Sequence, residues 1–231
     1  MNNVSLMALE GNSTELLKKY GLDSASINEF KSKIKQASKE ESDNLGKSLF
    51  ELVAKKGFND DYEKVIELIY NGANIEFKNE KKGDFALLIC ARKNYFKTFI
   101  VLVKAGVNIN QVNNYLTTAT MASARHGNKE MLEILISMGA DINARCLDGD
   151  NAIMSAKRHD QVECFNMLLN AQAYLNNRNL TNQTIMDLPG EVNFDSKFFE
   201  EGIATQTASQ ITEQQPLLLI QEAEQKLNKL K

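Results

Sequence analysis

Apolar residues recur at helical spacing along much of the chain, and a glycine often follows them. In the stretch 127–143 one face of a helix would carry Met131, Leu132, Leu135, Ile136 and Met138. Gly139 comes next, where the left-handed turn that ends a helix favours a residue without Cβ. Related stretches occupy 99–110 and 65–76, and they contain Gly106 and Gly72. The pattern predicts a row of repeated helical units.

The period of these units can be measured from the residue that we expect to open each first helix. These residues are Ser48, Phe85, Thr118, Asn151 and Thr184, at separations of 37, 33, 33 and 33 residues. A period near 33 residues with two helices per unit is typical of a helical solenoid.

Four segments carry a recognisable motif at this period. They read D-N-L-G-K-S-L-F-E-L-V-A-K-K-G (43–57), G-D-F-A-L-L-I-C-A-R-K-N (83–94), T-A-T-M-A-S-A-R-H-G (118–127) and G-D-N-A-I-M-S-A-K-R-H-D (149–160). Together with the G-A-D-I-N type endings they resemble the ankyrin-repeat family. The resemblance implies an all-α solenoid of helix-turn-helix repeats joined by β-turn or hairpin loops, which binds a protein partner on its concave face. The T-P-L-H tetrapeptide of that family is never complete here, so we expect a less stable array than the consensus.

The same register divides the chain. We expect an N-terminal helical cap at 1–42 with a degenerate repeat at 1–21, four ankyrin repeats at 43–176, a degenerate fifth repeat or C-terminal cap at 177–204, a polar linker at 205–215 and a C-terminal amphipathic helix at 216–231. Within the N-terminal cap, an amphipathic helix in 22–42 is expected to pack on the first repeat. The first repeat has three extra residues around Asn59-Asp60-Asp61, which lengthen the loop between its two helices.

Charge and cysteine content narrow the function classes. Residues 43–190 carry 17 Lys or Arg against 17 Asp or Glu, and residues 191–231 carry 4 against 7, which accounts for the net charge of −3. A neutral array argues against nucleic-acid binding through bulk charge. Three cysteines without a C-x-x-C pair favour a reducing compartment. The chain shows no export signal and no apolar run of the roughly 20 residues that a membrane span needs.

Motifs for catalysis or cofactor binding are absent from the sequence. There is no P-loop, G-x-G-x-x-G, G-x-S-x-G or H-E-x-x-H, so we expect a protein that is not an enzyme and has no cofactor. His126 and His159 lie 33 residues apart, but no Cys or carboxylate is expected to complete a tetrahedral metal site beside them. Cys90 is expected in the core, whereas Cys146 and Cys164 are candidates for reaction with a thiol reagent.

Basic pairs recur at the end of each first helix. They are Lys55-Lys56, Arg92-Lys93, Arg125-His126 and Arg158-His159. Cations are favoured at helix C-termini by about 0.3–1 kcal/mol each. In ankyrin arrays these positions also line the concave groove, so a ridge of cations could attract an acidic segment. Both explanations stay open. We expect charge reversal at Arg92, Arg125 and Arg158 to weaken binding with little change in fold, and the histidines to add affinity as pH falls through about 6.5.

The tips of the turns complete the presumed binding face. The partner-binding candidates are Lys55, Lys56, Lys81, Lys82, Arg92, Lys93, Asn114, Tyr115, Arg125, His126, Leu147, Asp148, Arg158 and His159. Tyr115 is the best single contact candidate, because an exposed tyrosine offers a large ring and a hydroxyl group.

The sequence thus indicates a non-catalytic protein–protein interaction module that binds an acidic or polar segment. Two alternatives remain: a secreted bacterial effector that binds a host protein, and a regulatory fragment of an enzyme whose chemistry lies in the terminal segments. We expect a cytoplasmic monomer, or secretion into a host cell if the source is an intracellular bacterium. The C-terminal helix is a candidate dimerisation or docking element.

Overall fold

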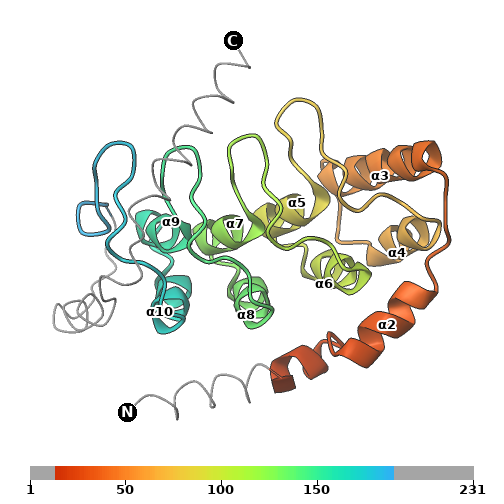
Figure 1. The fold of residues 1–231 in the computed structure, drawn as a ribbon, viewed down its shortest axis with the longest axis horizontal. Helices are drawn as coiled ribbons and strands as arrows, with labels where there is room; N and C mark the ends of the chain where they lie inside the picture. The colour runs from red at the N-terminus through yellow and green to blue at the C-terminus, as the bar shows by residue number, and fades with distance from the viewer. Residues whose placement is uncertain (1–13, 190–231) are drawn as a thin grey trace.

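The computed structural model describes residues 14–189 as a row of helix pairs (Figure 1). The helices are α2 (Ser24–Ser32), α3 (Lys39–Ala54), α4 (Tyr62–Tyr70), α5 (Ala86–Lys93), α6 (Phe96–Ala105), α7 (Ala119–His126), α8 (Lys129–Ser137), α9 (Ala152–Arg158) and α10 (Val162–Asn170). Residues 14–19 are also helical. The predictions for 1–13, for the linker at 205–215, for the helix at 216–231 and for the end of the fifth repeat concern residues outside the described range.

Two rows of helices make up the array. The inner row contains α3, α5, α7 and α9, and the outer row contains α4, α6, α8 and α10. We refer to the successive pairs as repeats 1 to 4. Loops that we call hairpins 1 to 4 follow them at 71–85, 106–118, 138–151 and 171–184. Figure 1 shows hairpins projecting to one side of the inner row, and the prediction of an all-α solenoid is confirmed.

Three of the residues expected to open a first helix do so. Phe85, Thr118 and Asn151 are the N-caps of α5, α7 and α9. The side chains of Thr118 and Asn151 each accept a hydrogen bond from the backbone N–H three residues on, at 3.1 Å. Such a bond satisfies one of the free amides of the first turn. Thr184 opens a turn at 185–187, where its N–H donates to the Asp187 carboxylate at 2.7 Å.

Ser48 does not open a helix, and here the sequence-based prediction was wrong. It lies inside α3, which begins at Lys39, within the segment assigned to the N-terminal cap. The cause is a capping box, in which the Ser38 hydroxyl accepts from the Glu41 N–H and the Glu41 carboxylate accepts from the Ser38 N–H. Two free donors are satisfied at once, so the helix starts two turns early.

Helix α2 lies across the outer row. Tyr20 meets Phe96 of α6 edge to face at 5.2 Å between ring centroids, and Phe30 meets Tyr70 of α4 at 5.0 Å. The Lys35 N–H donates to the Tyr70 carbonyl at 2.9 Å. The N-terminal segment therefore contacts repeats 1 and 2 together, because its aromatic residues bury against both outer helices.

The lengthened loop of repeat 1 stabilises the next repeat. Seven residues (55–61) join α3 to α4, whereas two (94–95) join α5 to α6. Asp60 in this loop accepts hydrogen bonds from the N–H groups of Lys97 at 2.8 Å and Thr98 at 2.9 Å. Its carboxylate thus caps the N-terminus of α6 from the neighbouring repeat, where free amides and the helix dipole favour negative charge.

The G-A-D-I-N type endings link neighbouring hairpins. In each ending the side chain of the fifth residue, which is Glu76, Asn110 or Asn143, accepts a hydrogen bond from a backbone N–H of the next hairpin. These contacts are Glu76 with Asn108 at 2.6 Å, Asn110 with Asp141 at 2.9 Å and Asn143 with Tyr174 at 2.7 Å. The motif therefore recurs because each hairpin must bind its neighbour.

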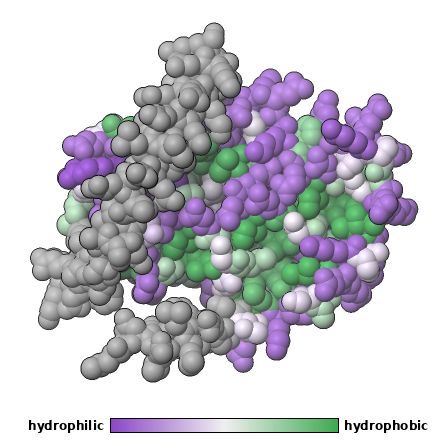
Figure 2. Space-filling model, viewed as in Figure 1, coloured by the Kyte–Doolittle hydropathy of each residue, from purple (hydrophilic) through white to green (hydrophobic). Residues whose placement is uncertain are grey.

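The core consists of two clusters of buried apolar side chains that meet in repeat 3. One reaches from Leu22 to Ala140 and the other from Met121 to Leu188. Each repeat buries its apolar stripe against its neighbours, as in other solenoids. In Figure 2 hydrophilic residues gather on the hairpin side, while hydrophobic surface lies mainly over the helices. Within 14–189 no helix combines the length and apolar character that crossing a bilayer requires.

Candidate functional site

Eight of the residues expected to bind a partner line one cavity of about 920 Å³. The cavity lies in the angle between the inner helices and hairpins 2 to 4. The eight residues are Arg92, Tyr115, Arg125, His126, Leu147, Asp148, Arg158 and His159. The 33-residue period therefore brings residues from three repeats to one surface.

The other six candidates are exposed and lie apart from this cavity. Lys55 and Lys56 follow α3, and Lys93 ends α5. Lys81, Lys82 and Asn114 lie at the tips of hairpins 1 and 2, where the Asn114 N–H donates to the Lys82 carbonyl at 2.9 Å. They extend the charged surface without lining the cavity.

Arg92 is paired within its own repeat. Its Nη1 lies 2.8 Å from Oδ2 of Asp84, the residue just before the N-cap of α5, and Asp84 is buried. The other oxygen of Asp84 accepts from the amide of Asn113, in hairpin 2, at 2.8 Å. The Asn113 side chain in turn accepts from the N–H groups of Tyr115 and Thr117. This network joins hairpins 1 and 2.

The same network recurs two repeats later. Asp150, before the N-cap of α9, accepts from Arg158 Nη2 at 2.8 Å and from the amide of Asn179 at 3.1 Å. The Asn179 side chain accepts from the N–H groups of Thr181 and Gln183. Hairpins 3 and 4 are therefore joined as hairpins 1 and 2 are.

These pairs correct the expectation of a row of free cations. Arg92 and Arg158 are held by carboxylates of their own repeats. Charge reversal at either position would set two carboxylates side by side, one of them inside the protein. Such a change would disturb the fold, so the triple reversal does not isolate binding.

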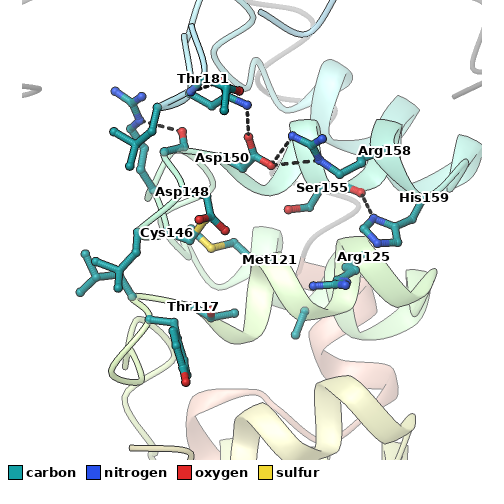
Figure 3. Close-up of a pocket in the computed structure, with 18 of the residues that line it drawn as sticks. Thr117, Met121, Arg125, Cys146, Asp148, Asp150, Ser155, Arg158, His159 and Thr181 are labelled. Atoms are coloured by element: carbon teal, nitrogen blue, oxygen red, sulfur yellow. Dashed lines mark hydrogen bonds and ion pairs between the residues drawn. The ribbon is translucent and has the colours of Figure 1, made fainter. Parts of the chain in front are cut away.

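The network is missing at the junction between hairpins 2 and 3. Thr117 occupies the place of Asp84 and Asp150, and Cys146 the place of Asn113 and Asn179. Arg125 is exposed, and in the part of the chain that the structure describes it has no carboxylate partner. Figure 3 shows it beside the cavity, without the bonds that Arg158 shares with Asp150.

A second contact between hairpins is missing at the same place. Lys78 Nζ donates to the Val112 carbonyl at 2.5 Å, and Arg145 Nη2 donates to the Arg178 carbonyl. Val112, the corresponding residue of hairpin 2, has no side-chain donor. The helices do not open here, since α7 packs closely on α9. The interruption is confined to the hairpin side chains and leaves Arg125 in the wall of the cavity, where no described residue supplies a carboxylate to it.

His126 and His159 lie beside Arg125. His159 Nδ1 is 3.0 Å from the Ser155 carbonyl. Partial burial lowers the pKa of His126, and the positive charge of Arg125 lowers it further. Without a bound anion, His126 is therefore mostly neutral at pH 6.5, and its expected gain of affinity shifts to lower pH. Among residues 14–189 no cluster of three or more His, Cys, Asp or Glu could hold a metal ion.

Cys90 lies in the core as expected, whereas Cys146 and Cys164 are less accessible than expected. Cys90 and Cys164 are buried, and Cys146 is partly buried. Burial raises the pKa of all three thiols, that of Cys164 to about 11. The reactivity expected of Cys164 is therefore corrected, because a buried neutral thiol is a poor nucleophile.

Sequence analysis missed the residues that decide which cations are free. These are Asp84, Asp150, Asn113, Asn179, Thr117 and Cys146. The 33-residue register does contain the signal, since Asp-Thr-Asp recurs just before the N-caps. The Asp residues matter because each pairs with the arginine eight residues later, and an alignment of the repeats does not reveal that contact.

The comparisons with known proteins agree with this architecture. The family profile described as "Ankyrin repeats (3 copies)" matches residues 50–146 and 117–179, which together span more than half of the chain. No curated protein matches the chain significantly. Profile, period and helix pairing give one assignment: the chain belongs to the ankyrin-repeat family.

Proposed function

We propose that the chain is a non-catalytic protein-binding module that holds an acidic segment of a partner in the cavity at Arg125. One observation carries the proposal: Arg125 lines a cavity, is exposed and, among residues 14–189, lacks the carboxylate that both of its counterparts have. Proteins of this family generally bind other proteins, and the inner surface of the array is where such a partner would lie.

The rim of the cavity suits a peptide better than a small ion. Tyr115 and Leu180 line it with 50% and 63% of their surface exposed, and Leu147 is partly exposed. Exposed large apolar residues beside a charged group are typical of protein-binding surfaces, where aromatic anchors contribute much of the affinity. A segment with an acidic residue and a neighbouring apolar residue would match both features.

Magnitudes favour a mixed contact over a purely ionic one. An exposed ion pair contributes about 0–1 kcal/mol, which is too little for specific binding. A partner that covers the cavity removes water from around Arg125 and strengthens the pair. Burial of Tyr115 and Leu180 would add roughly 25 cal/mol for each Å² of apolar surface. We therefore expect the charge to select the partner and the rim to supply most of the affinity.

A displayed library of random 16-residue peptides tests the proposal. Peptides selected on the wild-type chain should be enriched in Asp and Glu next to apolar residues. One labelled peptide is then titrated by fluorescence anisotropy against Arg125→Glu and against Lys97→Glu. Lys97 is exposed on the outer helix α6, so this variant changes the net charge equally on another face.

We expect Arg125→Glu to weaken binding at least about tenfold, which equals ~1.4 kcal/mol, and Lys97→Glu to leave it within about twofold. Failure to select any peptide would contradict the proposal. So would an equal loss in both variants, because the attraction would then depend on net charge alone.

A further inference from the structure

The network that joins the hairpins occurs at two of the three junctions between the described hairpins and is absent from the middle one, between hairpins 2 and 3. The cavity also reaches the complete network of hairpins 3 and 4. In the two complete networks a carboxylate lies between an arginine of the inner helix and an asparagine of the next hairpin. At the middle junction Arg125 is present, but no carboxylate of the described part of the chain pairs with it. Arg125 thus resembles an arginine from which the pairing carboxylate has been removed, and the other two junctions show where that carboxylate would lie.

We propose that the partner supplies the missing carboxylate: an Asp or Glu side chain of the bound segment pairs with Arg125, as Asp84 pairs with Arg92 and Asp150 with Arg158. This inference rests on the proposed function and gives it a mechanism. The partner's carboxylate would complete the network between hairpins 2 and 3. It would lie where Asp84 and Asp150 lie in the other two networks.

The geometry of the complete networks describes the contact. Arg92 Nη1 and Arg158 Nη2 each lie 2.8 Å from a carboxylate oxygen. Both arginines lie in the last turn of an inner helix, and both carboxylates belong to the residue before the N-cap of that helix. Arg125 likewise lies in the last turn of α7, and Thr117 precedes the N-cap of that helix. A carboxylate that enters beside Thr117 would therefore meet Arg125 as the internal ones meet their arginines.

Replacement of asparagine by Cys146 leaves this place open. The backbone of Cys146 still forms the turn of hairpin 3: its N–H donates to the Asp150 carbonyl at 3.0 Å, and its carbonyl accepts from the Gly149 N–H at 2.9 Å. A thiol has no amide group to donate toward position 117. The turn of hairpin 3 is thus kept, and so is its backbone bond to hairpin 2, in which the Leu147 N–H donates to the Tyr115 carbonyl at 3.0 Å. Only the side-chain link to position 117 is lost.

The surrounding charges select for a single acidic group. His126 and His159 lie on the same side as Arg125 and favour an anion when protonated. Asp148 lines the same cavity and is exposed, so it would repel a second carboxylate. We therefore expect one Asp or Glu flanked by apolar residues, in preference to a run of acidic residues.

Thr117→Asp tests the mechanism, because it places an internal carboxylate where the partner's would bind. The labelled peptide selected on the wild-type chain is titrated against Thr117→Asp, Thr117→Asn and Arg125→Glu. We expect Thr117→Asp to weaken binding at least tenfold and to raise the urea midpoint of unfolding. Thr117→Asn has almost the same shape without the charge and should bind within threefold of wild type.

The double variant Thr117→Asp/Cys146→Asn restores both partners found at the other junctions. It guards against a single aspartate that folds poorly for lack of its amide donor, and it should bind the peptide no better than Thr117→Asp. Circular dichroism confirms that each variant is folded. Wild-type affinity in a folded Thr117→Asp or in the double variant, with binding lost in Arg125→Glu, would overturn this inference and leave the proposed function standing. Unchanged affinity in Arg125→Glu as well would overturn both.

Discussion

The guanidinium of Arg158 lies 2.8 Å from the carboxylate of Asp150, across the whole length of helix α9. The pair joins the last turn of an inner helix to the residue before its N-cap and also holds the next hairpin through Asn179. Because such pairs are structural, the cations of this array are not equivalent. The paired arginines stabilise the fold, whereas Arg125 has no carboxylate partner among residues 14–189 and is the one that we propose binds a ligand.

Removal of a paired carboxylate should destabilise the array. Asp84→Thr would leave Arg92 and the Asn113 amide without their shared acceptor. Since Arg92 is 30% exposed, we expect a loss of about 2–3 kcal/mol, below that for a fully buried pair. Thr117→Ala, at the corresponding position of repeat 3, should cost less than about 1 kcal/mol. Urea unfolding of the two variants compares them, and equal losses would contradict a structural role for the Asp84 pair.

The loop insertion of repeat 1 should stabilise repeat 2. Asp60→Ala removes the acceptor of the Lys97 and Thr98 amides and should cost about 1–2 kcal/mol. Asp61→Ala, in the same loop, serves as the control. Asp61 is the N-cap of α4, but its side chain accepts no capping hydrogen bond and pairs with the exposed Lys64. Hydrogen exchange should show faster opening of the first turn of α6 in Asp60→Ala. Unchanged protection there would mean that the cap contributes nothing.

A glycine inside α3 should resist replacement by alanine. A Cβ on Gly46 would lie 2.5 Å from the Asn74 carbonyl oxygen, so the backbone of hairpin 1 would have to move. Gly46→Ala should therefore destabilise by about 1–3 kcal/mol, although alanine is the better helix former by about 1 kcal/mol. Ser48→Ala, exposed on the same helix, should be neutral or slightly stabilising. Thermal unfolding of both variants gives the answer, and a stabilised Gly46→Ala would show that the hairpin does not press on α3.

The stability of the array should fall as His126 becomes protonated. Burial and the Arg125 charge hold its pKa below the usual 6.5 in the folded chain, so the unfolded chain binds the proton more readily. The contribution of His126 is therefore complete above about pH 6.5 and is lost as pH falls from there through the folded pKa. Urea midpoints between pH 7.5 and 5.5 should fall less in His126→Gln than in wild type. An equal fall in both would contradict the lowered pKa.

Sequence reasoning succeeded where the structure follows local rules. The 33-residue register located Thr118 and Asn151 as N-caps because hydrophobic period and cap chemistry agree there. The register placed the start of the first helix at Ser48, although Ser38 and Glu41 form a capping box ten residues earlier. This capping box can be read in the sequence, and in the fold it sets the start of α3.

The candidate site was only partly predictable for a different reason. The period brought Arg92, Arg125 and Arg158 to one face, but the residue before each N-cap decides whether the arginine is paired with a carboxylate of its own repeat. Thr117 is unremarkable in a sequence until Asp84 is seen to hold Arg92. The cap that Asp60 provides for α6 likewise crosses between repeats, and no pattern within one repeat indicates it.

The most direct test of the account is the Nε–H cross-peak of Arg125 in a ¹H–¹⁵N spectrum recorded while the selected acidic peptide is added. A carboxylate bound to this guanidinium would shift and sharpen the cross-peak, because it shields the proton from exchange with water. We predict such a change for Arg125 and much smaller changes for Arg92 and Arg158, which already have their carboxylates. Saturation with peptide that leaves the Arg125 cross-peak unmoved would contradict the central claim that this arginine receives the partner's acidic group.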